Sequence, residues 1–254
     1  MQSINFHLKG LLLTFKAFAK GKYFWFLLPG VVTTMLYFWF NDYIGSVKDS
    51  SMLSSDYSWI NWFYGFLNEG LDKAFGIFSL LTEQLYIFFV LTILSPFNTA
   101  LAERFDSSFT GNKFEFNLLR VINDFLRMIF VVILLLFLEF MFILIYWMIS
   151  GIFGLEAFNP IAYYIITAFF IGISFYDFAL ERYEISVLGT INFGFSNPLS
   201  MLLTGSIFTL IYAIPYAGVP ISPVIAVMVS TIVYLYITKK LPREKQVLKE
   251  ETNE

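Results

Sequence analysis

The sequence contains no cysteine and a single histidine, His7, and only 14% of its 254 residues are charged. The absence of cysteine excludes disulfides, thiolate nucleophiles and iron–sulfur clusters, and one histidine leaves little for a zinc or haem site. The sequence also has no Ser-His-Asp arrangement, glycine-rich phosphate loop or metal-ligand spacing. We therefore expect a protein that is not an enzyme and that carries no metal or cofactor.

Apolar and aromatic side chains are in excess instead. Hydrophobic residues make up 58% of the chain and aromatic residues 20%, and the mean hydropathy is +0.71. The apolar runs are continuous rather than alternating, which favours membrane helices over the strands of a barrel. The net charge of -3 gives no excess of basic residues for nucleic acid. The composition predicts an all-α integral membrane protein.

The order of polar and apolar stretches predicts the organisation of the chain. Residues 1–22 alternate lysines with an apolar face, which predicts an amphipathic helix at the lipid headgroups. Four membrane segments are expected at 23–41, 74–94, 128–155 and 157–176, with a loop at 42–73 and a second amphipathic helix at 117–127. Ser95-Pro96 is typical of a helix start. We expect one polytopic helical domain, 1–238, followed by a charged cytoplasmic tail, 239–254.

The stretch 185–238 contains no charged residue. As one helix it would measure about 81 Å, against a hydrocarbon core of about 30 Å, so it must fold back. Prolines and a glycine mark the expected turn: Pro215, Gly218, Pro220 and Pro223. The first arm is short for a full crossing, which favours a hairpin that enters only part of the bilayer. Small residues at every fourth position predict that the two arms pack together, namely Gly205, Thr209 and Ala213 on one arm and Ser222, Ala226 and Ser230 on the other. The alternative is two ordinary spans whose small residues face other helices.

Basic residues concentrate in the N-terminal arm, in the 95–127 region and in the tail. By the positive-inside rule both termini are expected in the cytoplasm.

Several motifs resemble those of a known family. Ser95-Pro96-Phe97-Asn98, Leu101-Ala102-Glu103 and Thr110-Gly111 resemble the Ala-Pro-Phe-Asn…Leu-Ala-Glu…Thr-Gly signature of the CysZ sulfate permeases, which share a superfamily with the etoposide-induced membrane proteins. Tyr176-Asp177-Phe178 and the proline-turned C-terminal pair are similar to further features of that family. The resemblance implies a small, usually oligomeric, helical permease that passes sulfate across the bacterial inner membrane.

The chain departs from that family where the glycine before the first membrane helix is followed by an arginine pair associated with sulfate binding. The matching stretch here is Gly21-Lys22-Tyr23-Phe24, in which aromatic residues replace both arginines and Lys20 and Lys22 flank the glycine. An ammonium group lacks the bidentate fork of a guanidinium.

Two groups of residues are candidates for binding the substrate. Lys20, Gly21 and Lys22 combine cations with the N–H groups of a helix start, a pattern that suits an anion. The alternative is that the lysines meet lipid phosphates. The second group is Glu103, Arg104, Asp177 and Arg182, which we expect to line a polar vestibule through pairs such as Glu103 with Arg182 or Asp177 with Arg104. Its alternative is a solvated face, on which Asp177, Glu181 and Glu184 share one side of a helix.

Three polar residues lie inside or beside apolar segments. Glu83 and Glu139 are candidates for a proton or ion pathway, because an ionised carboxylate inside a membrane is costly and desolvation favours its neutral form. For Glu83 the alternative is a place near the interface. Asn98, two residues past Pro96, is expected to cap the helix or to hydrogen-bond locally rather than to contact a substrate.

The function expected is that of a CysZ-like permease or channel for sulfate or a related small oxyanion, acting as a homo-oligomer in the inner membrane without a cofactor and without nucleic acid. Two alternatives stay open. One is a non-transporting membrane scaffold that contacts lipid and partner proteins. The other is a proton-coupled transporter of another solute that uses Glu139.

Overall fold

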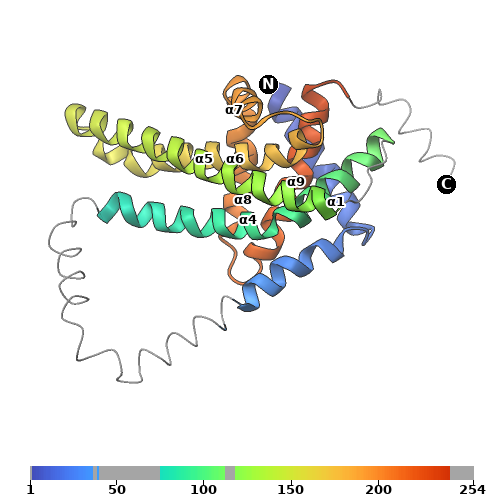
Figure 1. Ribbon diagram of the computed structural model, residues 1–254. Coiled ribbons are helices and arrows are strands. Elements are labelled where there is room, and N and C mark those ends of the chain that lie inside the picture. The colour runs from blue at the N-terminus through green and yellow to red at the C-terminus, as the bar shows by residue number, and fades with distance from the viewer. Residues whose placement is uncertain (1, 37–38, 40–74, 112–117, 241–254) are drawn as a thin grey trace, which may run out of the picture.

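The computed structural model describes residues 2–36, 39, 75–111 and 118–240, and every regular element in these ranges is a helix (Figure 1). The elements are α1 (Gln2–Ala19), η1 (Phe24–Leu27), α4 (Phe75–Thr110), α5 (Leu118–Phe153), η3 (Glu156–Phe158), α6 (Asn159–Glu181), α7 (Val187–Ser196), α8 (Pro198–Tyr212) and α9 (Gly218–Ile237). The expected all-helical class is confirmed. The predicted loop at 42–73 and nearly all of the predicted tail lie outside the described residues.

Helices α6 and α9 form the centre of the molecule. Nearly every side chain of α9 from Pro220 to Leu235 is buried, and α6 is buried continuously from Phe170 to Leu180. Helices α1, α4 and α8 pack against α9, and α5, α7 and α8 pack against α6. In Figure 1, α4, α5 and α6 extend to one side as long rods, whereas α1, α7, α8 and α9 gather towards the other side.

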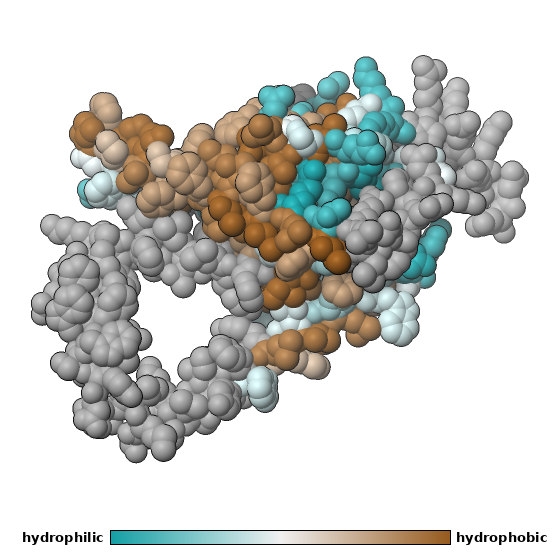
Figure 2. Space-filling model, viewed as in Figure 1, coloured by the Kyte–Doolittle hydropathy of each residue, from teal (hydrophilic) through white to brown (hydrophobic). Residues whose placement is uncertain are grey.

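Three helical stretches are long and apolar enough to cross a membrane: Ile122–Phe153, Glu156–Glu181 and Gly218–Ile237. Helices α7 and α8, bent by 99° relative to each other, pass the same criteria as a pair. Leu126, Phe130, Ile133 and Phe137 form an exposed apolar stripe at helical spacing on α5. Figure 2 shows apolar surface over the side of the molecule to which α5 and α6 extend. The chain is compatible with a multi-pass membrane protein.

The expected segments 128–155 and 157–176 correspond to α5 and α6. The segment expected at 23–41 is described as the short apolar helix Phe24–Leu36, and the rest of that segment is outside the described residues apart from Trp39. The segment expected at 74–94 lies in α4.

Two predicted helix boundaries are wrong. Helix α4 continues through Pro96 instead of starting there, and the amphipathic piece 117–127 belongs to α5. A proline inside a helix removes one backbone hydrogen bond. Leu91 and Leu94 before it and Leu101 and Ala102 after it are all buried, so packing on both sides holds α4 together. In α5 no proline or glycine separates the polar first turns from the apolar remainder.

The neutral stretch 185–238 folds back on itself, as predicted. The reversal occupies 213–217 and includes Tyr216 at a φ of 62°. Pro220 and Pro223 lie in the first turns of α9, not in the reversal. The first arm is also more complex than expected, because α7 precedes α8 and the chain bends at Asn197-Pro198.

The small residues of the two arms meet a third helix. A Cβ atom on Gly205 of α8 would collide with the backbone of Ala168 in α6. The Ser230 hydroxyl of α9 donates a hydrogen bond to the Phe175 carbonyl of α6 at 3.1 Å. Helices α8 and α9 do contact each other. At Gly205 and Ser230, however, the prediction that the small residues join the two arms is wrong, and the alternative that they face other helices is correct.

Candidate functional site

Two networks of charged groups, most of them buried, lie at the C-terminal end of α6. The Arg182 network comprises Asp106 and Thr110 of α4 with Arg182, Tyr183, Tyr234 and Lys240. The Arg127 network comprises Arg127 of α5, Asp177 and Glu181 of α6, and Thr190 of α7. Asp177 and Arg182 are five residues apart, so the two networks lie on neighbouring turns at the end of one helix.

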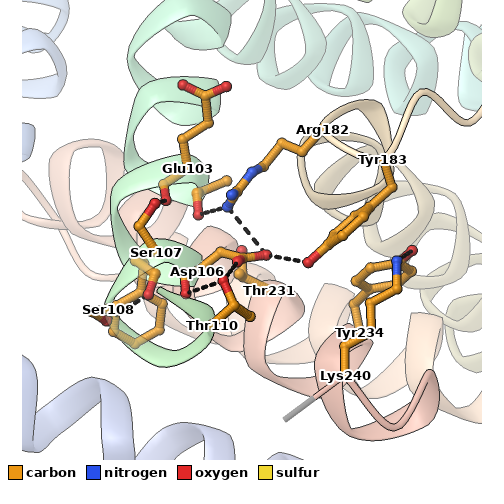
Figure 3. A network of polar contacts seen from close by, with 12 residues as sticks. Glu103, Asp106, Ser107, Ser108, Thr110, Arg182, Tyr183, Thr231, Tyr234 and Lys240 are labelled. Atoms are coloured by element: carbon orange, nitrogen blue, oxygen red, sulfur yellow. Dashed lines mark hydrogen bonds and ion pairs between the residues drawn. The ribbon is translucent and has the colours of Figure 1, made fainter. Parts of the chain in front are cut away.

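Asp106 is the centre of the Arg182 network (Figure 3). Its Oδ2 lies 3.3 Å from Nη1 of Arg182 and accepts a hydrogen bond of 2.7 Å from the Tyr183 hydroxyl. Its Oδ1 accepts a hydrogen bond of 2.6 Å from the Thr110 hydroxyl. Nη1 of Arg182 also donates to the Ala102 carbonyl. The side chain of Arg182 has no exposed surface and Asp106 is 1% exposed, so both charges are held almost without water.

Lys240 covers the outer side of this network. Its Nζ lies 3.1 Å from the centroid of the Tyr183 ring and 3.2 Å from the Tyr234 hydroxyl, a cation–π arrangement. Burial lowers the pKa of Lys240, and the charge of Asp106 opposes that shift. Burial and the hydrogen bond to Asp106 raise the pKa of Tyr183, so the phenol stays a hydrogen-bond donor to the carboxylate.

The Arg127 network is a forked ion pair. Nη2 of Arg127 lies 2.7 Å from Oδ1 of Asp177, and Nε lies 3.2 Å from Oδ2. This two-point geometry is the strong form of an arginine–carboxylate pair. The Thr190 hydroxyl donates a hydrogen bond of 2.7 Å to Oδ1 of Asp177, and Nε of Arg127 lies 3.8 Å from Oε1 of Glu181.

A sharp reversal after α6 brings Thr190 back to Asp177. Glu184 has a φ of 56°, in the left-handed region, just beyond the end of α6. The Ser186 hydroxyl then caps α7 by accepting a hydrogen bond from the Gly189 N–H. The sequence predicted that Glu184 shares a helix face with Asp177 and Glu181. That prediction is wrong, because the helix ends before Glu184.

The structure brings together only some of the predicted site residues. Asp177 and Arg182 are buried in the two networks, but Asp177 pairs with Arg127 instead of Arg104. Arg104 is exposed on α4. Glu103 is partly buried one turn before Asp106, and its carbonyl accepts a hydrogen bond from Ser107.

Lys20, Gly21 and Lys22 form an exposed turn between α1 and η1, with Gly21 at a φ of 70°. The buried ring of Tyr23 meets Phe105 edge-on at 5.4 Å. This contact places the turn beside the end of α4 that carries Asp106, but outside both networks.

Glu139 occupies a separate position on the seam between α5 and α6. It is fully buried and its Oε1 accepts a hydrogen bond of 2.7 Å from Thr167. Its Oε2 is buried and has no hydrogen-bond partner among the described residues. Farther along the same antiparallel seam, Ser150 bonds to Asn159. Glu83 lies in α4, but its side chain is outside the described part of the structure.

The sequence alone did not single out four residues of these networks: Asp106, Arg127, Tyr183 and Thr190. The available signal was spacing, since Asp106 lies one helical turn after Glu103. In the described ranges, no group of three or more His, Asp or Glu side chains is placed to hold a metal ion.

No protein-family model matches the sequence, and no match is found among curated proteins.

Proposed function

We propose that the protein is a multi-pass membrane permease or channel for a small oxyanion such as sulfate, and that the anion passes the Arg182 and Arg127 networks. The observation that supports this most is the complete burial of the Arg182 side chain in a chain of this apolarity. A charge buried in a protein is costly unless it is paired, and buried charged groups in membrane proteins often line a substrate or ion pathway. Guanidinium groups also match the geometry of oxyanions better than ammonium groups do.

In this proposal Asp106 and Asp177 hold the two arginines in place while no anion is bound. An anion that approaches competes with Asp106 or Asp177 for the guanidinium, and the hydroxyls of Thr110, Tyr183 and Thr190 offer additional donors to it. The exposed lysines at positions 20 and 22, beside the end of α4, raise the local concentration of anions. The proposal includes a homo-oligomer in the inner membrane with both termini in the cytoplasm, where basic residues near the helix ends are favoured.

The test is the flux of labelled sulfate into liposomes that contain the purified protein, with sulfite, phosphate, chloride and protons measured in parallel. Arg127→Lys keeps the charge but removes the fork, and we expect it to slow sulfate flux about tenfold, the cost of one charge-assisted hydrogen bond. Lys16→Gln, which removes an exposed charge on α1, is the matched control and leaves flux unchanged.

Flux through the wild-type protein that equals leakage from empty liposomes would contradict the proposal. That outcome would favour the non-transporting scaffold.

Proton-coupled transport is a second candidate, favoured by the buried Glu139 and its bond to Thr167. A carboxyl group enclosed in this way suits proton binding. Glu139→Gln preserves the hydrogen bond from Thr167 but cannot release a proton. Uptake with an unchanged rate and pH dependence in this variant would exclude this candidate.

A further inference from the structure

A row of buried polar groups lies on the middle of α4, apart from both networks. The Ser95 hydroxyl, the Asn98 amide nitrogen and the Thr99 hydroxyl are each buried, and none has a hydrogen-bond partner among the described residues. The three residues are 1%, 3% and 2% exposed. Their spacing of three and four residues places them on one face of the helix. The expectation that Asn98 bonds locally is therefore wrong for its amide nitrogen.

Two other hydroxyls on α4 are satisfied locally. Thr92 and Ser107, on the same helix, each donate a hydrogen bond of 2.8 Å to the carbonyl four residues earlier. That local bond is the usual way in which a helix satisfies a buried serine or threonine. Ser95 and Thr99 leave it unmade, and a buried donor without a partner destabilises a fold. A bound molecule that accepts hydrogen bonds would satisfy these donors.

The same face of α4 also carries Asp106, the centre of the Arg182 network. Thr99 precedes Asp106 by seven residues, or two helical turns, which is about 10 Å along the axis. Helix α9, which packs on α4, carries one more buried hydroxyl without a partner, that of Ser222. Thr99 and Asp106 therefore lie on the same side of α4, with Leu101, Ala102 and Phe105 buried between them.

We propose that Ser95, Asn98 and Thr99 form a second binding site for the oxyanion, inside the helix bundle, where neutral donors hold it. This inference rests on the proposed function. The amide nitrogen offers two N–H groups and each hydroxyl offers one O–H, so the site presents four donor hydrogens. Such a set suits an anion rather than a cation, and it leaves no uncompensated charge in the membrane when the site is empty.

The site is closed in this structure, because all three polar atoms are buried. An anion reaches it when α4 moves away from the helices that cover it. Pro96 lies within the site and removes one backbone hydrogen bond from α4, which makes this the point where the helix bends most easily.

The experiment compares two identical substitutions on one helix. Thr99→Val removes a hydroxyl without a partner, and Thr92→Val removes one that is bonded. Sulfate binding to the detergent-purified full-length protein is measured from the rise in unfolding temperature, with chloride at equal ionic strength as the reference. We expect Thr99→Val to weaken sulfate binding about three- to tenfold, the effect of one neutral hydrogen bond. Without sulfate, its unfolding temperature is unchanged or higher. Thr92→Val leaves the affinity for sulfate unchanged.

Asn98→Leu, of similar volume, is the second variant and weakens sulfate binding more strongly because it removes two donors. Wild-type protein that sulfate stabilises no more than chloride does would overturn the inference, as would Thr99→Val and Asn98→Leu that bind sulfate like the wild type. If these variants bind normally while Arg127→Lys slows sulfate flux, the inference alone fails. If wild-type liposomes pass no sulfate while binding still depends on Thr99, the site stands and the proposed permease function fails.

Discussion

Arg182 and Asp106 are opposite charges held where almost no water reaches them. An ion pair of this kind adds little net stability, because the loss of hydration offsets the attraction between the charges. Removing one partner is different, since it leaves the other charge buried and uncompensated. Each charge of the pair is therefore stable in the bundle only while the other is present.

The first prediction concerns this pair. Asp106→Leu is expected to lower the free energy of unfolding by about 3 kcal/mol, because Arg182 loses its counter-charge. Adding Arg182→Met to the same protein restores most of that loss without restoring sulfate flux. Thermal unfolding in detergent measures both effects. If Asp106→Leu alone is as stable as the wild type, Arg182 does not depend on Asp106 as its counter-charge.

The second prediction concerns His7, the only histidine in the chain. Its Nδ1 lies 2.7 Å from the Ser3 carbonyl, and its Nε2 lies 3.0 Å from the Thr204 hydroxyl of α8. Burial lowers the pKa of His7 below its usual 6.5, so the folded protein favours the neutral ring. The stability due to this preference is present above pH 6.5 and is lost as the pH falls towards the lower pKa of the folded state.

Unfolding measured between pH 5 and pH 8 should therefore show stability that decreases below about pH 6.5. In His7→Gln, which has no titrating ring, this part of the pH dependence disappears. An identical pH profile in the two proteins would assign the effect to other groups.

At the scale of helices, the sequence predicted those helices that a long apolar run is enough to identify. Long apolar runs predicted α5 and α6, and the length of the stretch 185–238 required a reversal. The bend between α7 and α8 and the continuity of α4 through Pro96 depend on packing by residues far away in the chain. Local pattern carries no information about such contacts, which is why Ser95-Pro96 was misread as a helix start.

Close approach of helices gives the third prediction. Gly205 of α8 lies against the backbone of Ala168 in α6, so Gly205→Val forces the two helices apart and strongly lowers the unfolding temperature. Gly151→Val on α5 is the matched control, because no atom lies within 4 Å of the added Cβ. Equal unfolding temperatures in the two variants would contradict the packing of α8 on α6.

For the molecule as a whole, the sequence singled out some of the buried charged residues but not the partners that they bind. It identified Asp177 and Arg182, because charges at the end of an apolar helix stand out. It missed Arg127 as the partner of Asp177, since the antiparallel register of α5 and α6 pairs residues fifty positions apart. It also placed weight on Lys20 and Lys22, which the fold leaves on an exposed turn.

The central claim is that anions reach the buried arginine networks from outside the bundle. Because the chain has no cysteine, Thr110→Cys places a single thiol one helical turn from Asp106. The most direct measurement is the rate at which this thiol reacts with negatively and positively charged methanethiosulfonate reagents in liposomes. We expect that the anionic reagent reacts faster, that sulfate slows this reaction, and that the modified protein no longer passes sulfate. A thiol that reacts equally with both reagents and is not protected by sulfate would contradict it.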